Sequence, residues 1–484
     1  MPTYGPDTVH PNLIGGQRVE GTEVNTNVNP SDTSDVVGRY AMATADQARD
    51  AFVAARAAAA SWAEATPLTR FEVLDAAGAE ILRRKDELGD LLAREEGKTL
   101  PEAVGEVVRA AHIFKFHAGQ ALRPAGQLLD SIRPGIEVAV TREPVGVVSI
   151  ITPWNFPIAI PAWKIAPALA YGNTVVFKPA ELVPGSAWEL VNILKGAGLP
   201  DGVLNLVMGR GREIGDILTS SADAVSFTGS VQTGERVLAS ATGAKARVQL
   251  EMGGKNPLVV LDDADLELAV ECALQGAYGS TGQRCTASSR FVVTDGIHDR
   301  FVERLSERML ALQVGDARAA GTQMGPVVDA SQLAQDEKYV AIARDEAGTV
   351  IGGRRLERAT EGFYLEPALV VGTNPGDTIN RDEVFGPVAS LVKVGSYDEA
   401  LAVANGTEFG LTSGIVTTSL AAATDFRRRS TAGMVMVNVP TAGVDFHVPF
   451  GGRQGSSYGP REQGEQAREF FTTVKTAYIA AGQP

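Results

Sequence analysis

The chain has few cysteines for its length and no long apolar run. Two of its 484 residues are cysteines, Cys272 and Cys285, and neither lies in a cluster with histidines. A disulfide framework and a zinc site are therefore excluded, and we predict no metal. No segment reaches ~18 consecutive apolar residues, and the first residues have neither a basic start nor a signal-like apolar run. The sequence thus predicts a cytoplasmic protein with no membrane partner.

The chain also has fewer basic than acidic residues. The 44 Lys and Arg residues face 58 Asp and Glu residues, a net charge of −14 that is spread along the chain. Nucleic-acid binding requires a basic stripe, so nucleic acid is excluded as a main partner. The remaining composition is that of an ordinary globular protein, and at ~150 residues per domain the length predicts about three domains or two large ones.

The first half of the chain begins with helices and then turns to β-strands. Thr44 and Gln47 form a capping box in front of a predicted helix, and a second helix presents Phe71, Leu74 and Ala77 on one face. Between Gly146 and Gly254 five β-rich runs alternate with helical stretches, which predicts an α/β fold with a doubly wound parallel sheet. The runs are VGVVSII, NTVVFK, VLNLV, DAVSF and ARVQLE.

The second half repeats the alternation. NPLVVLDD, RFVVTD, GPVASLVKV and GMVMVN read as strands with helices between them, which predicts a second α/β unit. The segment IRPGIEVAVTREP reads as a hairpin and FFTTVKTAYIA as a terminal strand. These two peripheral elements would pair either with each other or with another subunit.

Three residues are candidates for chemistry. Cys285, preceded by Gly-Gln-Arg, is either a nucleophile or a small buried side chain. Glu251 ends a strand and is followed, after Met252, by two glycines. Partial burial there would raise its pKa and suit a general base; a capping or ion-pair role is the alternative. Asn155, in the rigid turn TPWNFP, would either donate to an oxyanion or satisfy its own turn.

Several strand ends carry groups suited to a nucleotide. Ligands of doubly wound sheets bind beyond the carboxyl ends of the strands. There, Lys178 and Glu181 would either hold ribose hydroxyls or form an ion pair. The weak motif GRGREIG contains Gly211, and the helix start after FTGS is suited to a pyrophosphate. The residues of that helix start are Gly229, Ser230 and Gly234.

Taken together, these motifs resemble the NAD(P)-dependent aldehyde dehydrogenase superfamily along nearly the whole chain. The resemblance rests on the ordered set TPWNFP, FKPAE, SFTGS, LEMGGKNP, GQRC, EVFGPV and PFGG. It implies that Cys285 is the nucleophile, Glu251 the general base and Asn155 an oxyanion donor. It also implies that Glu462 lies near a proton path. The cofactor-binding residues implied by the family or by the strand ends are Trp154, Lys178, Glu181, Gly211, Gly229, Ser230, Gly234, Glu383 and Phe385.

The resemblance also implies the domain organisation. We predict a dinucleotide-binding domain over residues 1–126 and 147–254 and a catalytic domain over 255–464. Residues 127–146 and 465–484 would form a small β oligomerisation element, so a homodimer or a homotetramer is expected.

The sequence constrains the identity of the aldehyde substrate less than it constrains the reaction. Long runs of the chain look like α-ketoglutaric semialdehyde (2,5-dioxopentanoate) dehydrogenases of bacteria. Arg284 and Ser288 would then bind the distal carboxylate, although Arg284 would alternatively tune the thiolate or pair with an acidic neighbour. Phe156 and Phe450 are candidate tunnel walls, or simply packing residues. Succinate or glutarate semialdehyde, or an uncharged aliphatic or aromatic aldehyde, are the alternative substrates.

The cofactor and the rival functions follow from the same residues. Glu181 would repel a 2′-phosphate, which favours NAD, with NADP as the alternative if Glu181 swings away from Lys178. Glu251 favours hydrolysis of a thioester over its transfer to coenzyme A. A non-catalytic structural protein should have lost these residues, and a cofactor-free thiol esterase would be a side activity of the same nucleophile.

Overall fold

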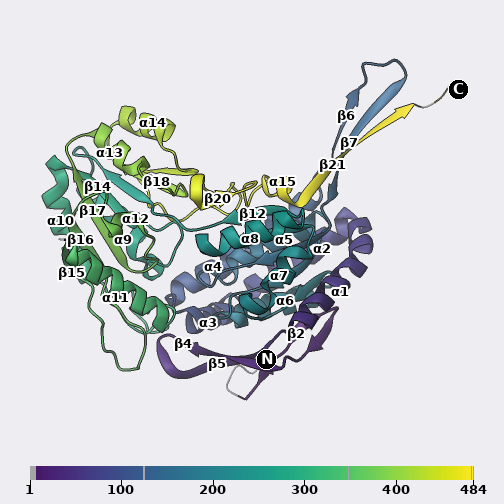
Figure 1. Ribbon diagram of the computed structural model, residues 1–484, viewed down its shortest axis with the longest axis horizontal. Helices are drawn as coiled ribbons and strands as arrows, with labels where there is room; N and C mark the ends of the chain where they lie inside the picture. The colour runs from purple at the N-terminus through teal and green to yellow at the C-terminus, as the bar shows by residue number, and fades with distance from the viewer. Residues whose placement is uncertain (1–6, 124–125, 347, 481, 483–484) are drawn as a thin grey trace.

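In the computed structural model, the described residues are 7–123, 126–346, 348–480 and 482. They build two α/β units, a small N-terminal sheet and a projecting arm (Figure 1). None of the helices in these ranges combines the length and the apolarity needed to cross a membrane.

The first unit has a sheet of eight described strands, and the five strands predicted between Gly146 and Gly254 form its parallel centre. That prediction is confirmed. Short antiparallel strands at both edges were not predicted, and one of them, β20, comes from far along the chain. In sheet order the strands are β20 (Ser457–Tyr458), β12 (Arg247–Glu251), β11 (Ala224–Thr228), β8 (Val147–Ile151), β9 (Thr174–Lys178), β10 (Leu204–Leu206), β2 (Asn12–Ile14) and β3 (Gln17–Val19).

Helices cover both faces of this sheet because successive side chains of the central strands point in opposite directions. Val148 packs among helices α2 to α6, whereas Val147 packs with α1, α7 and α8 on the other face. The predicted capping box of Thr44 and Gln47 is present at the start of α1. The helices are α1 (Ala45–Glu64), α2 (Pro67–Arg83), α3 (Lys85–Glu96), α4 (Leu100–Ala121), α5 (Ala159–Ala170), α6 (Pro184–Gly196), α7 (Gly211–Ser220) and α8 (Val231–Gly243).

The second unit has a sheet of seven described strands, all parallel except for β15 at one edge. Its order is β15 (Thr349–Gly352), β16 (Ala368–Thr373), β17 (Val388–Val394), β14 (Arg290–Thr294), β13 (Pro257–Val260), β18 (Thr412–Val416) and β19 (Met434–Val437). The accompanying helices are α9 (Leu266–Tyr278), α10 (Asp295–Leu310), α11 (Ala330–Asp345), α12 (Thr378–Arg381), α13 (Tyr397–Asn405) and α14 (Leu420–Arg429). The predicted second α/β unit is therefore confirmed, and it lies beside the first (Figure 1).

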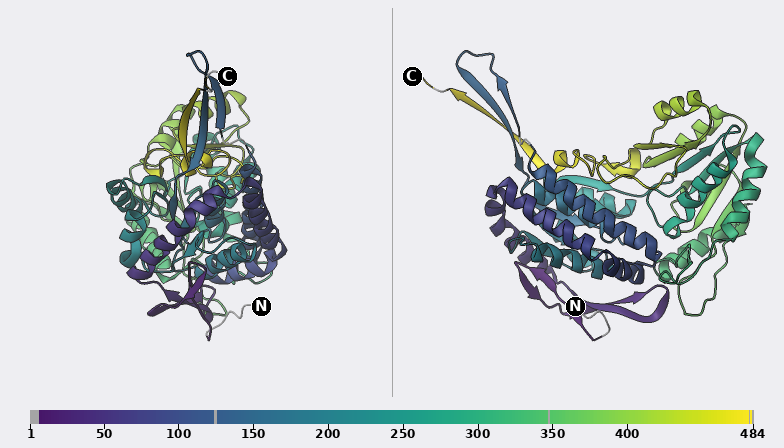
Figure 2. Two further views of the ribbon diagram at one scale, coloured as in Figure 1. Left: turned by 90° about the vertical axis from the view of Figure 1, so that its right-hand side faces the viewer. Right: turned by 180° about the vertical axis from the view of Figure 1, so that it is seen from behind.

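The two peripheral elements pair with each other. The arm consists of β6 (Gly126–Asp130), β7 (Ile136–Pro144) and β21 (Thr472–Ala480), all antiparallel, and it projects from the body in each view (Figure 2). The helix α15 (Ala467–Phe471) leads into β21. A separate small sheet joins β1 (Val9–His10), β5 (Asp32–Met42) and β4 (Glu23–Asn29).

Candidate functional site

A cavity of about 990 Å³ lies at the carboxyl ends of the first sheet's strands and reaches Cys285 of the second unit. Gly234 is not among the residues that line it, because this glycine, in the first turn of helix α8 (Val231–Gly243), faces Met252. Glu251 and Glu462 lie behind the cavity wall. The expected residues that do line it are Trp154, Asn155, Lys178, Glu181, Gly211, Gly229, Ser230, Cys285, Glu383 and Phe385.

Cys285 lies on a loop that leaves α9 through a left-handed turn. Ser280 (φ 49°) and Thr281 (φ 58°) adopt positive φ values that non-glycine residues rarely take. The amide of Ser280 donates to Glu102 Oε1 at 2.8 Å, and Thr281 Oγ1 donates to Gly325 O at 3.1 Å. Such strain persists only where surrounding contacts hold it, so the direction of this loop is fixed before any ligand arrives.

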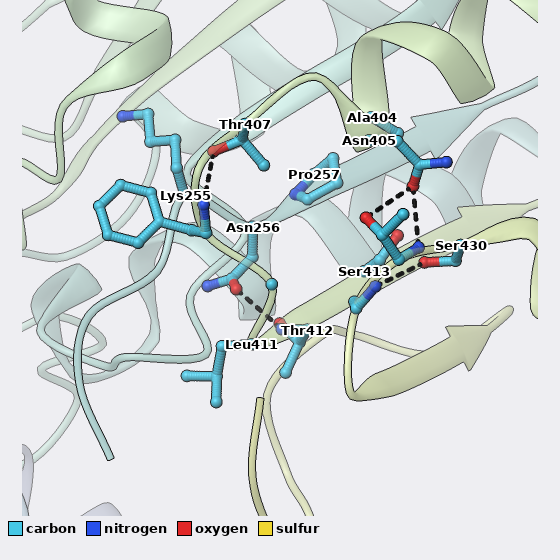
Figure 3. A pocket seen from close by; sticks show the side chains of 14 residues that line it. Lys255, Asn256, Pro257, Ala404, Asn405, Thr407, Leu411, Thr412, Ser413 and Ser430 are labelled. Carbon is cyan, nitrogen blue, oxygen red and sulfur yellow. Dashed lines mark hydrogen bonds between the residues drawn. The ribbon is translucent and has the colours of Figure 1, made fainter. Parts of the chain in front are cut away.

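Two side-chain amides hold the backbone around Cys285. Asn155 Nδ2, after β8, donates to Gln283 O at 3.0 Å, and Asn256 Nδ2, before β13, donates to Cys285 O at 2.7 Å. Asn256 Oδ1 in turn accepts from the amide of Thr412, as Figure 3 shows. Because a carboxamide nitrogen carries two hydrogens, Asn155 keeps one for an oxyanion at the cavity.

The Cys285 thiol lies among carboxylates. Burial, followed by the charges of Glu383 and Glu251, raises its pKa to about 12. Glu383 itself accepts from the amide of Gly254 at 2.8 Å, and burial raises the pKa of this carboxyl to about 7. Without a ligand, the thiol is therefore protonated at neutral pH.

Glu251, at the end of β12, faces the loop that precedes β20. Its Oε2 accepts from Ser457 Oγ at 2.5 Å, and its Oε1 lies so close to Gly451 that a Cβ there would approach it to 2.6 Å. Burial, and next the charge of Glu462, raises the pKa of Glu251 well above its ordinary value. A buried carboxyl with a raised pKa can accept a proton near neutral pH, as a general base must.

Glu462 is fixed from two sides. Lys164, a lysine inside the buried helix α5, forms an ion pair with its Oε1, and Trp163 Nε1 donates to its Oε2 at 2.7 Å. All three side chains are nearly inaccessible to solvent. The pair keeps a charged lysine and a carboxylate within electrostatic reach of Glu251, since both alter its pKa.

The cavity fits a dinucleotide. Lys178 Nζ donates to Pro179 O at 3.1 Å and lies 3.8 Å from Glu181 Oε1. A donor and an acceptor thus lie side by side, as binding of two adjacent ribose hydroxyls requires. Ser230 caps α8, whose first amides point to the cavity side where a pyrophosphate would bind. Trp154 and Phe385 meet edge to face at 5.4 Å.

The expected substrate residues are differently placed. Arg284 donates to Glu102 Oε1 and to Ser280 Oγ, both at 2.8 Å, so its charge is already paired. Ser288 is fully buried and shares a hydrogen bond with Thr441 Oγ1. Phe450 packs on Trp163 at 5.4 Å, and Phe156 lies under Lys98 Nζ. Across the described ranges, no three metal-binding side chains cluster.

Sequence reasoning missed Lys164, Ser457 and Asn256. Only Lys164 left a signal, because a lysine inside the apolar run AWKIAPALA must find a buried partner. Ser457 and Asn256 are ordinary polar residues whose role depends on contacts with distant segments.

Comparisons with known proteins agree with this geometry. The sequence profile described as the Aldehyde dehydrogenase family matches residues 18–477. An alpha-ketoglutaric semialdehyde dehydrogenase of Bacillus subtilis is 42% identical over 93% of each chain. An alpha-ketoglutarate semialdehyde dehydrogenase of Haloferax volcanii is 43% identical over 96% of this chain and 98% of that protein. A crystal structure of betaine aldehyde dehydrogenase from Staphylococcus aureus in complex with NAD+ matches with a TM-score of 0.95 and 32% identity, over 98% of this chain and 96% of that one.

The electrostatics of the thiol can be tested by alkylation. Glu383→Gln keeps the acceptor for the Gly254 amide but removes a negative charge that raises the pKa of Cys285. We expect the rate of Cys285 alkylation by iodoacetamide, followed by mass spectrometry without added nucleotide, to rise at lower pH than in the wild type. Glu20→Gln, on the exposed surface, is the control. An unchanged pH profile above pH 8 would show that Glu383 does not act on the thiol.

Proposed function

This chain belongs to the aldehyde dehydrogenase family, and from that membership we propose that it oxidises 2,5-dioxopentanoate to 2-oxoglutarate with NAD+. The observation that supports the reaction best is the convergence of a thiol and an amide donor on one nucleotide-sized cavity, with the buried carboxylate of Glu251 near enough to the thiol to raise its pKa. The substrate is inferred from the two semialdehyde dehydrogenases that are 42% and 43% identical.

In the proposed mechanism, the thiol of Cys285 loses its proton to solvent and the resulting thiolate attacks the aldehyde carbon. The free N–H of Asn155 and the backbone amide of Cys285 stabilise the oxyanion of the thiohemiacetal. The hydride of the former aldehyde carbon would pass to a bound nicotinamide, which would leave a thioester on Cys285. Glu251 then takes a proton from water, and the resulting attack on the thioester releases the carboxylic acid.

The residues that line the cavity would hold the cofactor. Lys178 and Glu181 would bind the adenosine ribose, the start of α8 the pyrophosphate, and Glu383 the second ribose. Glu181 Oε1 accepts from the amide of Gly211 at 3.3 Å, which ties this carboxylate to the start of α7. A 2′-phosphate would meet that charge, so we propose a preference for NAD+ over NADP+.

The arm supports self-association. Leu129 and Tyr478 pair with the two sides of Val138 and therefore share one face, and Tyr478 is 62% exposed. We propose that this face packs against another copy of the chain, since exposed apolar side chains on a projecting sheet mark an interface.

Glu251→Gln should stall the enzyme after hydride transfer. The amide cannot take a proton from water, so a burst of NADH followed by very slow turnover, at least about a hundredfold below the wild type, is expected in stopped-flow absorbance. Cys285→Ala should give neither burst nor turnover while still binding NAD+. Normal steady turnover of Glu251→Gln would assign hydrolysis to another base.

The substrate can be identified by initial rates. We expect kcat/KM for 2,5-dioxopentanoate to exceed that for succinate semialdehyde, glutarate semialdehyde, propanal and benzaldehyde by at least about tenfold, or ~1.4 kcal/mol of transition-state stabilisation. NADH and NADPH formation are measured side by side, and NADH should form faster. If an uncharged aldehyde is preferred, the proposed substrate is wrong.

Light scattering tests the arm. The wild type should have a mass of at least twice the 50.9 kDa of one chain. Leu129→Lys combined with Tyr478→Lys should shift the mass toward the monomer, because two charges would be buried at the interface. Val53→Lys, an exposed position on α1, is the control. A monomeric wild type would contradict the proposal.

A further inference from the structure

Arg109 brings a positive charge into the interior beside the active site. It lies on α4, partly buried, with its guanidinium 5.6 Å from the centre of the Trp163 ring. Burial lowers the pKa of Arg109, and the charges that oppose this shift come from Glu106, Asp445 and Cys285. The same Trp163 donates to Glu462 and packs on Phe450, so the ring that supports Arg109 is itself fixed.

No carboxylate neutralises this guanidinium. Within the described residues, no Asp or Glu oxygen lies within 4 Å of it, and its Nε has no acceptor. The acidic groups that influence it are Glu106 and Asp445. Glu106 is already engaged by Lys98 at 2.6 Å and by two backbone amides, and Asp445 is exposed to solvent. A partly buried cation without an anionic partner is costly, and an anionic ligand would offset that cost.

Gln463 adds a second unused donor. Its Oε1 accepts from Arg109 Nη2 at 3.2 Å. Because a guanidinium can only donate, this contact fixes the amide orientation and leaves Nε2 facing away from Arg109. Nε2 has no acceptor, although the residue is fully buried. The backbone of Gln463 has a φ of 58°, a strained conformation of the kind that clusters at ligand sites.

Arg284 offers no comparable site. Glu102 already occupies its guanidinium at 2.8 Å, and Ser280 Oγ accepts a second bond from the same nitrogen. A substrate carboxylate would have to displace Glu102, which also holds the amide of Ser280.

We propose that Arg109 binds the distal carboxylate of the substrate and that Gln463 orients Arg109 and donates a second hydrogen bond to the same carboxylate. This inference rests on the proposed function, because it supplies the anion site that a semialdehyde with a terminal carboxylate requires. Trp163, Phe450 and Phe156 would enclose the short carbon chain between that site and Cys285. Charge-assisted hydrogen bonds are among the strongest in proteins, so the site would select such substrates over uncharged aldehydes.

The test compares Arg109→Met with Arg284→Met, a matched loss of charge. The measured quantity is kcat/KM for 2,5-dioxopentanoate divided by kcat/KM for propanal. Arg109→Met should lower this ratio about 10- to 100-fold, as expected for loss of a charge-assisted bond. Arg284→Met should leave the ratio within about threefold of the wild type, and Arg109→Lys should restore part of it.

An isosteric variant covers the case in which Arg109→Met does not fold. Gln463→Glu places a carboxylate on Arg109 with almost no change in shape, so the ratio should fall as well. Glutarate serves as a probe of binding alone: it should inhibit propanal oxidation competitively in the wild type and at least about tenfold less strongly in both variants.

The outcomes separate the two proposals. If the wild type prefers 2,5-dioxopentanoate but Arg109→Met and Gln463→Glu keep the ratio and the glutarate inhibition, the assignment to Arg109 is overturned and the proposed function stands. A fall in Arg284→Met alone would place the carboxylate at Arg284. If the wild type shows no preference and no inhibition by glutarate, both proposals fail.

Discussion

The site depends on how the Cys285 loop is held between the two sheets. Asn155 follows a strand of the first sheet and Asn256 precedes a strand of the second, and each donates to a backbone carbonyl within the short segment from Gln283 to Cys285. Neither sheet alone fixes the thiol. The strained residues Ser280 and Thr281 complete this arrangement, because their left-handed backbone turns the chain out of α9 toward the cavity. The position of the nucleophile is thus a property of the contact between the two units.

Buried ion pairs set the electrostatics around this loop. Lys98 and Glu106 pair at 2.6 Å in the interior, and they also lock the turn that carries Asn155. Lys98 donates to Asn155 O at 2.8 Å, and Glu106 accepts from the amides of Ile158 and Ala159. The pair of Lys164 and Glu462 is also buried, and both of its charges alter the pKa of Glu251. Such pairs seldom add much stability because both charges lose water. Here the Lys98–Glu106 pair instead orients the backbone of the turn that carries Asn155, which apolar side chains could not do because they form no hydrogen bonds.

Much of the fold and part of the site could be predicted from the sequence, because these features depend on residues that lie close together along the chain. The central strands of both sheets are apolar runs bounded by glycine and proline, and the motif residues stand directly at strand ends, so their shared edge follows from parallel pairing. Edge strands such as β20 have two residues and leave no periodic signal. The supporting contacts were beyond reach because they join distant segments: Lys164 to Glu462 across 298 residues, Ser457 to Glu251 across 206, and Arg109 to Gln463 across 354. Arg284 shows the opposite case, since its place next to Cys285 in sequence suggested a substrate role while its guanidinium reaches Glu102.

The late strands of the chain have a consequence for its biogenesis. β21 completes a sheet with β7, and β20 completes one with β12, so the last thirty or so residues close structures begun much earlier. Contacts of such sequence separation form slowly because a long loop must close first. On a ribosome, the first sheet would stay open at this edge, with Glu251 lacking Ser457 and Glu462, until residues 457–462 have been made. A chain that stops before residue 457 would therefore carry Cys285 and Glu251 without the groups that hold and tune Glu251, and nascent chains would depend on protection from aggregation along that unpaired edge.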